Sequence, residues 1–77
     1  MPTVLRVEGY RFFFYSNEHL PKHIHVEFGG GVAKYSLESC ELVKAKRLNA
    51  TNINLIRKLV VEHKELLITK WNEYFNN

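Results

Sequence analysis

The hydrophobic pattern of this chain changes its period once, close to Asn49, and that change limits the folds that the chain can adopt. Before Asn49, apolar and polar residues alternate, as they do on strands with one buried face. After Asn49, the buried side of a helix is predicted from positions spaced three or four apart, at Ile56, Val60, His63, Leu67, Trp71 and Tyr74. Strands followed by one helical segment predict an α+β fold: a four- to five-stranded, mostly antiparallel meander with a C-terminal amphipathic helix packed on one face.

Turn-forming residues separate the expected strands. Residues 3–16 are predicted to form a hairpin that turns at Glu8-Gly9, where glycine supplies a positive φ. The further strands are predicted at residues 23–28, 32–38 and 40–46. The helix is predicted to run for roughly twenty residues or more, with Asn49 or Thr51 as its N-cap and a bend or break near His63.

Two strands carry signals of their place in the sheet. Phe12, Phe13 and Phe14 are consecutive, so their strand presents bulk on both faces and is expected to be central. Charge on both faces of the last strand, at Lys44 and Lys46 among others, favours a position at the sheet edge.

The chain has 77 residues, and we expect it to form one domain over residues 1–77. A single cysteine, Cys40, excludes an intrachain disulfide and is typical of a reducing compartment. No apolar run approaches the length that a membrane span requires. We therefore expect a cytoplasmic protein without membrane contact.

Three of the four histidines lie within seven positions, at His19, His23 and His25. On a strand, residues i and i+2 share a face about 6.5–7 Å apart, so His23 and His25 can act together. Imidazoles titrate near neutral pH and can serve as the base and the acid of metal-independent RNA cleavage. We predict His23 and His25 as a catalytic acid–base pair, supported by His19 and by a cation such as Lys22, Lys34 or Arg11.

Two other interpretations of these histidines stay open. No cofactor is expected, because the spacing is not a common zinc pattern, yet His19, His23 and His25 are the ligands if zinc or another divalent metal binds. Glu18 and Glu27 then offer carboxylates. Alternatively, His23 and His25 hydrogen-bond across strands and perform no chemistry.

The formal net charge is +3, and the basic residues are clustered in part of the sequence. Such residues attract the phosphates of nucleic acid or an acidic partner protein, or form an ordinary solvated surface. The residues predicted to bind are Lys22, Lys34, Lys44, Lys46 and Arg47.

The chain resembles the DUF4160 family, small bacterial proteins named as a domain of unknown function. The resemblance covers nearly the whole chain and rests on the segments PTVLR, YRFFFYSNEH, HLPKHIHVEFG, AKYSLE and LVVEHKELLITKWNEY. The family pattern His-x-Pro-Pro-His-x-His, with an aromatic or aliphatic residue between the last two histidines, stands here as His19 to His25, with Lys22 in place of the second proline. The segment KAKRLNA also departs from the family, which usually carries glycine and proline there.

The resemblance implies the sheet-plus-helix fold, a bacterial cytoplasm, and His19, Pro21, His23 and His25 as signature residues. It also implies a gene neighbour of the DUF2442 type, in pairs that look like type II toxin–antitoxin modules. We therefore expect a toxin-like component that a small antitoxin-like protein holds inactive and that acts on RNA or another phosphate-containing substrate. A non-catalytic interaction module of a two-protein complex is the alternative, and a homo-oligomer stays open.

Overall fold

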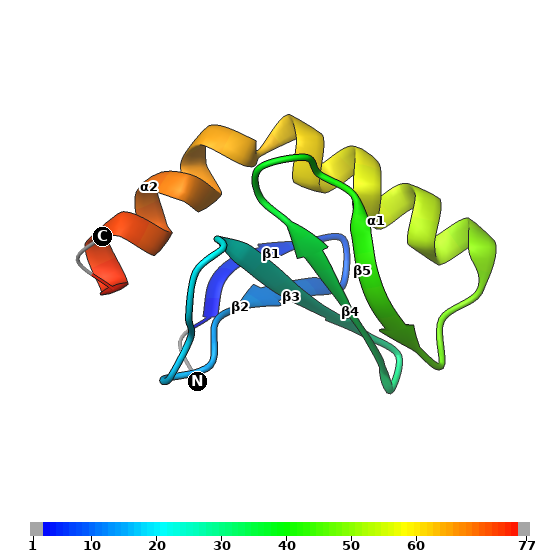
Figure 1. Ribbon diagram of the computed structural model, residues 1–77. Helices are drawn as coiled ribbons and strands as arrows, with labels where there is room; N and C mark the ends of the chain where they lie inside the picture. Colours follow the sequence, from blue (N-terminus) through cyan, green and yellow to red (C-terminus); the bar gives the residue numbers. More distant parts are fainter. Residues whose placement is uncertain (1–2, 76–77) are drawn as a thin grey trace.

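The two hydrophobic periods of the sequence correspond to two layers of the structure, a computed structural model that describes residues 3–75. Its elements are β1 (Thr3–Val7), β2 (Tyr10–Phe13), β3 (His23–Phe28), β4 (Gly31–Ser36), β5 (Leu42–Lys46), α1 (Ala50–Glu62) and α2 (Lys64–Phe75). The strands form one antiparallel sheet in the order β1-β2-β3-β4-β5, and both helices lie on the same side of it (Figure 1). The prediction of an α+β meander followed by helix is confirmed.

Two hairpin turns fix the register of the first four strands. Both central residues have positive φ in each turn, with Glu8 at 49° and Gly9 at 87°, and Gly29 at 53° and Gly30 at 85°. This is the backbone of a two-residue type I′ turn, whose twist matches that of the flanking strands. The predicted turn at Glu8-Gly9 is confirmed. β4 begins at Gly31, one residue earlier than expected.

The boundaries of β4 and β5 differ from the prediction. The strand expected at 32–38 ends at Ser36, and the one expected at 40–46 begins at Leu42. Ser36 Oγ accepts the N–H groups of Glu38 and Ser39, at 3.1 and 3.3 Å. A short hydroxyl side chain that bonds the backbone just beyond it favours a turn over a continued strand.

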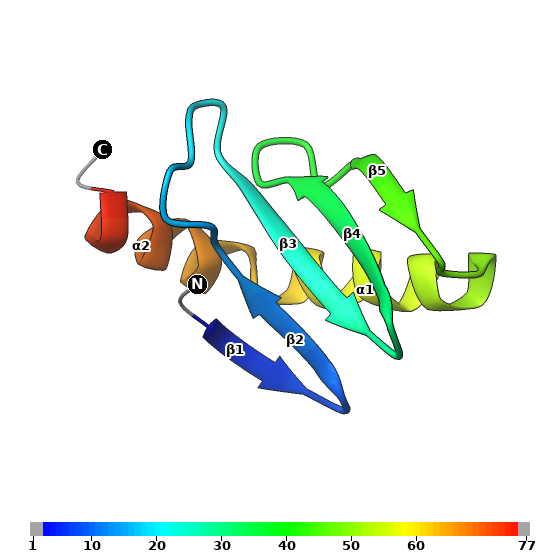
Figure 2. The ribbon, with the colours of Figure 1, turned by 90° about the horizontal axis from the view of Figure 1, so that it is seen from below.

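The single helix expected after Asn49 is two helices that meet at His63, so of the bend or break expected there the structure has a break. Asn49 is the N-cap, because its side chain accepts the N–H of Asn52 at 2.8 Å. His63 closes α1 by donating its N–H to the carbonyl of Leu59. The change of direction lets α2 continue past the end of the sheet, behind the loop at residues 14–22 (Figure 2).

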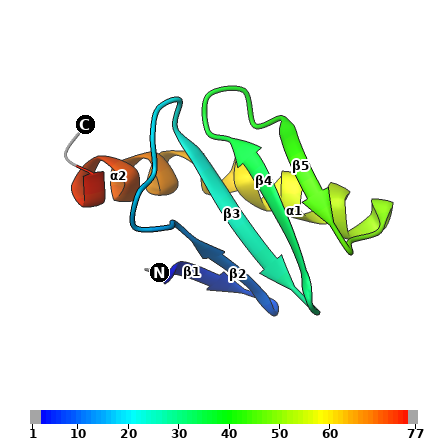
Figure 3. The same ribbon diagram turned by 60° about the horizontal axis from the view of Figure 1, so that its bottom comes forward.

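The core lies between the helices and one face of the sheet. Its fully buried members include Phe12, Phe14, Ile24, Val26, Tyr35, Leu37, Ile56, Val60, Leu67 and Trp71. Tyr35 joins the two layers by donating its hydroxyl to the carbonyl of Ile53, at 2.6 Å. The other face of the sheet carries no helix within residues 3–75, and Figure 3 shows it toward the viewer. We call it the open face.

The aromatic run at residues 12–14, where β2 ends, is buried on both faces of the sheet, as predicted. Phe12 and Phe14 enter the core, whereas Phe13 is only 2% exposed on the open face. The Arg11 guanidinium lies 4.2 Å from the Phe13 ring centre, and the rings of Tyr15 and His25 pack beside it. β5 lies at the sheet edge, also as predicted, and four of its five residues are exposed.

Candidate functional site

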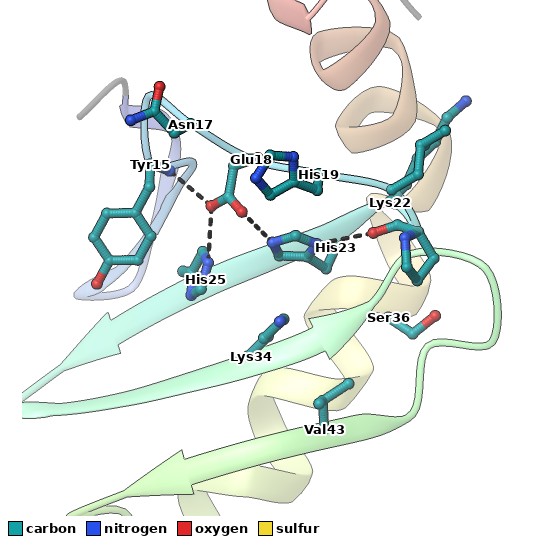
Figure 4. A pocket seen from close by; sticks show the side chains of 12 residues that line it. Tyr15, Asn17, Glu18, His19, Lys22, His23, His25, Lys34, Ser36 and Val43 are labelled. Atoms are coloured by element: carbon teal, nitrogen blue, oxygen red, sulfur yellow. Dashed lines mark hydrogen bonds and ion pairs between the residues drawn. The ribbon is translucent and has the colours of Figure 1, made fainter.

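Glu18 and two histidines come together where β3 begins. The period of two places His23 and His25 on the open face of β3, while Ile24 and Val26 point to the core. The loop at residues 14–22 passes over this end of the strand and brings the Glu18 carboxylate between the two rings (Figure 4). The side chains of Glu18 and His23 are each 8% exposed, and that of His25 is 13% exposed. We call these three residues the Glu–His–His cluster.

The carboxylate of Glu18 is held from three sides. Its Oε1 accepts the backbone N–H of Tyr15 at 2.9 Å and lies 2.9 Å from His25 Nε2. Its Oε2 contacts His23 Nε2. Burial alone would raise the pKa of Glu18. The hydrogen bond from the Tyr15 N–H and the two imidazoles together lower it by more, so the net pKa lies below its usual value. Glu18 is therefore an anion at neutral pH.

The tautomer of His23 follows from its partners. Its Nδ1 lies 2.9 Å from the carbonyl oxygen of Pro21, which can only accept a hydrogen bond, so Nδ1 carries a proton. In a neutral ring, Nε2 then presents a lone pair to a carboxylate oxygen of Glu18. Two lone pairs in contact repel each other, so this contact requires a positive charge between the two atoms, either a proton or a metal ion.

His25 presents an unpaired nitrogen to the same carboxylate. Its Nε2 is buried and has no hydrogen-bond partner among residues 3–75, although it lies within ion-pair distance of Glu18 Oε1, at 2.9 Å. Burial lowers the pKa of His25 below 6.5, and the neighbouring His23 and Lys34 lower it further, against the opposite effect of Glu18. The ring is therefore neutral at pH 7 and can provide a lone pair.

Two cavities on the open face adjoin the cluster. One has a volume of about 400 Å³ and is lined by the cluster together with His19, Lys22 and Ser36, among others. The other has a volume of about 300 Å³ and lies over β4 and β5. Both cavities are lined by Tyr15, His25 and Lys34, so they are adjacent. We call the two adjacent cavities together the basic groove; its polar and aromatic lining includes Tyr15, His25, Lys34, Lys44 and Lys46.

The predicted catalytic residues differ in how the structure places them. His23 and His25 converge on one carboxylate. His19 is exposed and lines the larger cavity, but its ring is not part of the convergent group, which consists of Glu18, His23 and His25. The sequence offered Glu18 and Glu27 as equivalent carboxylates, and Glu27 instead pairs with Arg11 at 2.9 Å. Glu18, and not Glu27, reaches the histidines because of the path that the loop at residues 14–22 takes across β3.

The predicted binding residues also separate into groups. Lys34, Lys44 and Lys46 line the smaller cavity together, because the register places Lys34 directly opposite Lys44 on the next strand. Lys22 lines the larger cavity near the cluster. Arg47 follows β5 with a φ of 57° and lines neither cavity.

Neither helix among residues 3–75 is long and apolar enough to cross a membrane. A comparison with protein families matches residues 9–72 to the family described as "Domain of unknown function (DUF4160)". No curated protein and no solved structure matches the chain. The matched residues extend from the first turn into α2 and contain the Glu–His–His cluster and the whole basic groove. The chain therefore belongs to the DUF4160 family.

Proposed function

We propose that this domain binds RNA along the basic groove and cleaves a phosphodiester at the Glu–His–His cluster. The observation that carries the proposal is that the cavity lined by Lys34, Lys44 and Lys46 adjoins the cavity lined by the buried cluster, with Tyr15, His25 and Lys34 lining both. The lysines predicted to bind and the histidines predicted to be catalytic would then act on the same RNA strand.

The arrangement of the lysines supports an anionic ligand. Lys34 and Lys44 face each other across neighbouring strands, and like charges at directly opposed positions destabilise a sheet. Within residues 3–75, none of Lys34, Lys44 and Lys46 forms an ion pair with a carboxylate. A phosphate backbone would relieve this repulsion, because each phosphate places a negative charge between cations.

Tyr15 supports a single-stranded nucleic acid over a small anion. The residue is 43% exposed and lines both cavities, and its ring packs edge-on against His25 at 4.5 Å between ring centres. A partly exposed aromatic ring beside a basic groove provides a surface on which an unpaired base can stack. A base on Tyr15 would place its own phosphate and ribose near His25 and the cluster.

The proposed reaction uses the 2′-hydroxyl of RNA. The 2′-oxygen attacks the adjacent phosphorus, the bond from phosphorus to the 5′-oxygen breaks, and a 2′,3′-cyclic phosphate forms. The cluster takes the 2′ proton, a proton passes from the cluster through a water to the leaving 5′-oxygen, and the Lys34 ammonium offsets the charge on phosphate, so the cluster ends in its starting protonation state. DNA lacks the attacking hydroxyl and is expected to bind without cleavage.

Binding is tested with charge-matched variants and a fluorescent single-stranded RNA, by anisotropy at several salt concentrations. Changing Lys34, Lys44 and Lys46 together to Gln should weaken binding at least about tenfold and flatten the salt dependence. The control changes Arg57, Lys58 and Lys70 to Gln on the helices, which removes the same charge away from the groove. Equal losses in the two triple variants would show that the groove has no special part in binding.

Cleavage is tested by identifying the products. We expect the 2′,3′-cyclic phosphate ends from RNA, no products from DNA of the same sequence, and no products from a His23→Ala, His25→Ala double variant. Activity that the double variant retains would disprove the role of the cluster. A His19→Ala variant should still cleave RNA if the buried pair His23 and His25, and not the exposed imidazole of His19, carries the reaction.

The toxin-like role is the cellular form of the same proposal. Induced expression should slow growth, and co-expression of a small antitoxin-like protein of the DUF2442 type should restore it. A non-catalytic interaction module is the second candidate, and it is favoured by Leu42 and Val43, which are 42% and 57% exposed on the edge strand β5. That candidate predicts no growth defect from expression alone and a higher melting temperature on addition of the partner.

A further inference from the structure

We infer that the Glu–His–His cluster is a three-ligand site for a divalent transition-metal ion, with zinc as the preferred metal and one coordination position open to the larger cavity. Glu18 provides a carboxylate oxygen, and His23 and His25 each provide Nε2. This inference does not depend on RNA as the substrate. The metal ion is the positive charge that would lie between the Glu18 carboxylate and the two imidazole rings.

His23 is oriented as a metal ligand. Its Nδ1–H donates to the Pro21 carbonyl at 2.9 Å, and this fixes the Nε2 lone pair toward the Glu18 carboxylate. Metal-bound histidines commonly donate their second nitrogen to a backbone carbonyl in this way, which fixes the tautomer and raises the basicity of the ligating nitrogen. A divalent cation between Nε2 and the carboxylate would turn a repulsive contact into two favourable bonds.

His25 provides an independent observation. Its Nε2 is buried without a hydrogen-bond partner among the described residues, although it lies only 2.9 Å from Glu18 Oε1. A buried polar atom without a partner is uncommon and destabilising. A proton shared between His23 and Glu18 leaves this nitrogen unpaired, whereas a metal ion held by all three residues satisfies it.

The spacing and chemistry of the donors fit zinc. One donor atom from each residue can be chosen so that all three lie within 4.8 Å of one another. In a tetrahedral site with bonds of about 2.0–2.1 Å, ligand atoms lie about 3.3 Å apart, so small side-chain rotations suffice. Two imidazoles and one carboxylate form a donor set of catalytic zinc sites, in which the fourth position holds water.

The surroundings would keep the metal in place and accessible from one side. Tyr15 donates its N–H to Glu18 Oε1, which holds the carboxylate at the cluster. The Trp71 ring packs against His23 at 5.2 Å between ring centres and closes the inner side. The larger cavity lies on the outer side, where a bound water would meet the groove. A water activated there would be the base that the proposed RNA cleavage requires.

The test is zinc binding by protein without a histidine tag, first stripped with a chelator and then titrated in competition with a chromophoric zinc indicator. We expect one equivalent of zinc per chain and a rise in melting temperature with added zinc. Glu18→Gln should weaken binding at least about tenfold, the smallest loss typical even for a partner of a metal ligand. Glutamine keeps the shape of Glu18 and can donate an N–H to His23 Nε2, so this variant is expected to fold.

Two further measurements keep the result decisive. His19→Ala removes the neighbouring exposed imidazole and should change zinc affinity less than twofold, while His25→Gln should weaken it as Glu18→Gln does. Cobalt in place of zinc should give the intense visible absorption of a four-coordinate site in the wild-type protein. Binding of less than a tenth of an equivalent, or an equal loss in His19→Ala, would overturn the inference.

Discussion

At the scale of single residues, one carboxylate organises the candidate site. Glu18 is an anion enclosed by a backbone N–H and two imidazoles, with only 8% of its side chain exposed. Glu27 is also next to a cation, Arg11, but its side chain is 50% exposed. Removing either glutamate therefore has a different effect on stability, because the loss of a partner costs more free energy when the polar groups left behind are buried.

This difference predicts the effect of removing each carboxylate from the metal-free protein. Glu18→Ala should lower the free energy of unfolding by about 2–4 kcal/mol at pH 7, because Tyr15 N–H and His23 Nε2 lose their partner. Glu27→Ala, which breaks an exposed ion pair, should cost less than about 1 kcal/mol. Urea denaturation in chelator measures both. Similar losses for the two variants would contradict the buried position of Glu18.

The stability difference between wild type and Glu18→Ala should depend on pH. The folded protein holds the pKa of Glu18 below its ordinary 4.5, so the stabilisation by the ionised carboxylate is complete above pH 4.5. It is lost as the pH falls through the lower pKa of the folded state. The difference in unfolding free energy between wild type and Glu18→Ala should therefore shrink below pH 4.5, as denaturation at a series of pH values would show. A constant difference down to pH 2 would contradict the lowered pKa.

Gly31 provides a prediction from a close approach of two backbones. A Cβ at this position would lie 2.3 Å from the Arg47 carbonyl oxygen, so Gly31→Ala should destabilise the fold by about 1–3 kcal/mol. Gly29→Asn is the control, because Gly29 has open space around it and a φ of 53° that asparagine tolerates. Thermal denaturation compares the two variants. A loss confined to Gly29→Asn would show that turn geometry, and not the contact with Arg47, limits this hairpin.

At the scale of elements, the helices and the sheet are joined by few polar contacts across an apolar core. Tyr35 on β4 donates its hydroxyl to Ile53 in the first turn of α1, and Asn52 reaches the hydroxyl of Tyr10 on β2. Further along the chain, Lys64 at the start of α2 donates to the Glu38 carbonyl in the β4–β5 turn. The break at His63 separates α1 from α2, and Trp71 of α2 packs against Phe14 and His23 beyond the end of α1.

The contact between Tyr35 and α1 predicts a stability change with a defined pH range. Tyr35→Phe should cost about 1 kcal/mol at pH 7, the usual value of one hydrogen bond. Burial raises the pKa of Tyr35 above 10, so the wild-type advantage is full below pH 10 and is lost as the pH rises above it. Guanidinium denaturation between pH 7 and 11.5 tests this, with exposed Tyr74→Phe as the control. An advantage that stays constant to pH 11.5 would argue against the buried hydroxyl.

At the scale of the whole molecule, one core serves both layers. Trp71, the only tryptophan, is fully buried and packs against Phe14 and Phe75, so residues from the sheet side and from α2 share one cluster. The open face instead carries the charge and the cavities. Stability and the proposed function are thus assigned to opposite faces of the same sheet.

A shared core predicts that the two layers unfold together. Tryptophan fluorescence, which reports on Trp71, and far-ultraviolet circular dichroism, which reports on all elements, should give the same denaturation midpoint. A helical signal that disappears before the fluorescence change would show that α1 and α2 separate from the sheet first. The groove variants at Lys34, Lys44 and Lys46 should keep the wild-type midpoint or raise it, because they remove the repulsion between opposed lysines.

The sequence by itself determined the order and type of the elements and the faces of β3. Side-chain alternation and helical period are properties of the local backbone, so His23 and His25 were expected on one side of a strand and Ile24 and Val26 on the other. The turn at Glu8-Gly9 was found for the same reason, since it depends on a few neighbouring residues. The bend or break near His63 was expected instead from the length of the helical segment, which exceeds the average helix. The end of β4 was missed, because the alternation continues into residues that Ser36 turns away from the sheet.

Only the tertiary structure decided which residues form the candidate site. Glu18 and His19 are neighbours in a loop, and no local pattern shows which of the two enters the cluster. The answer depends on where the loop crosses β3 on the open face of the sheet. The groove likewise exists because strand register places Lys34 beside Lys44, ten positions apart in the sequence. Contacts between distant segments are set by the balance of burial and register over the whole fold, which a local period does not contain.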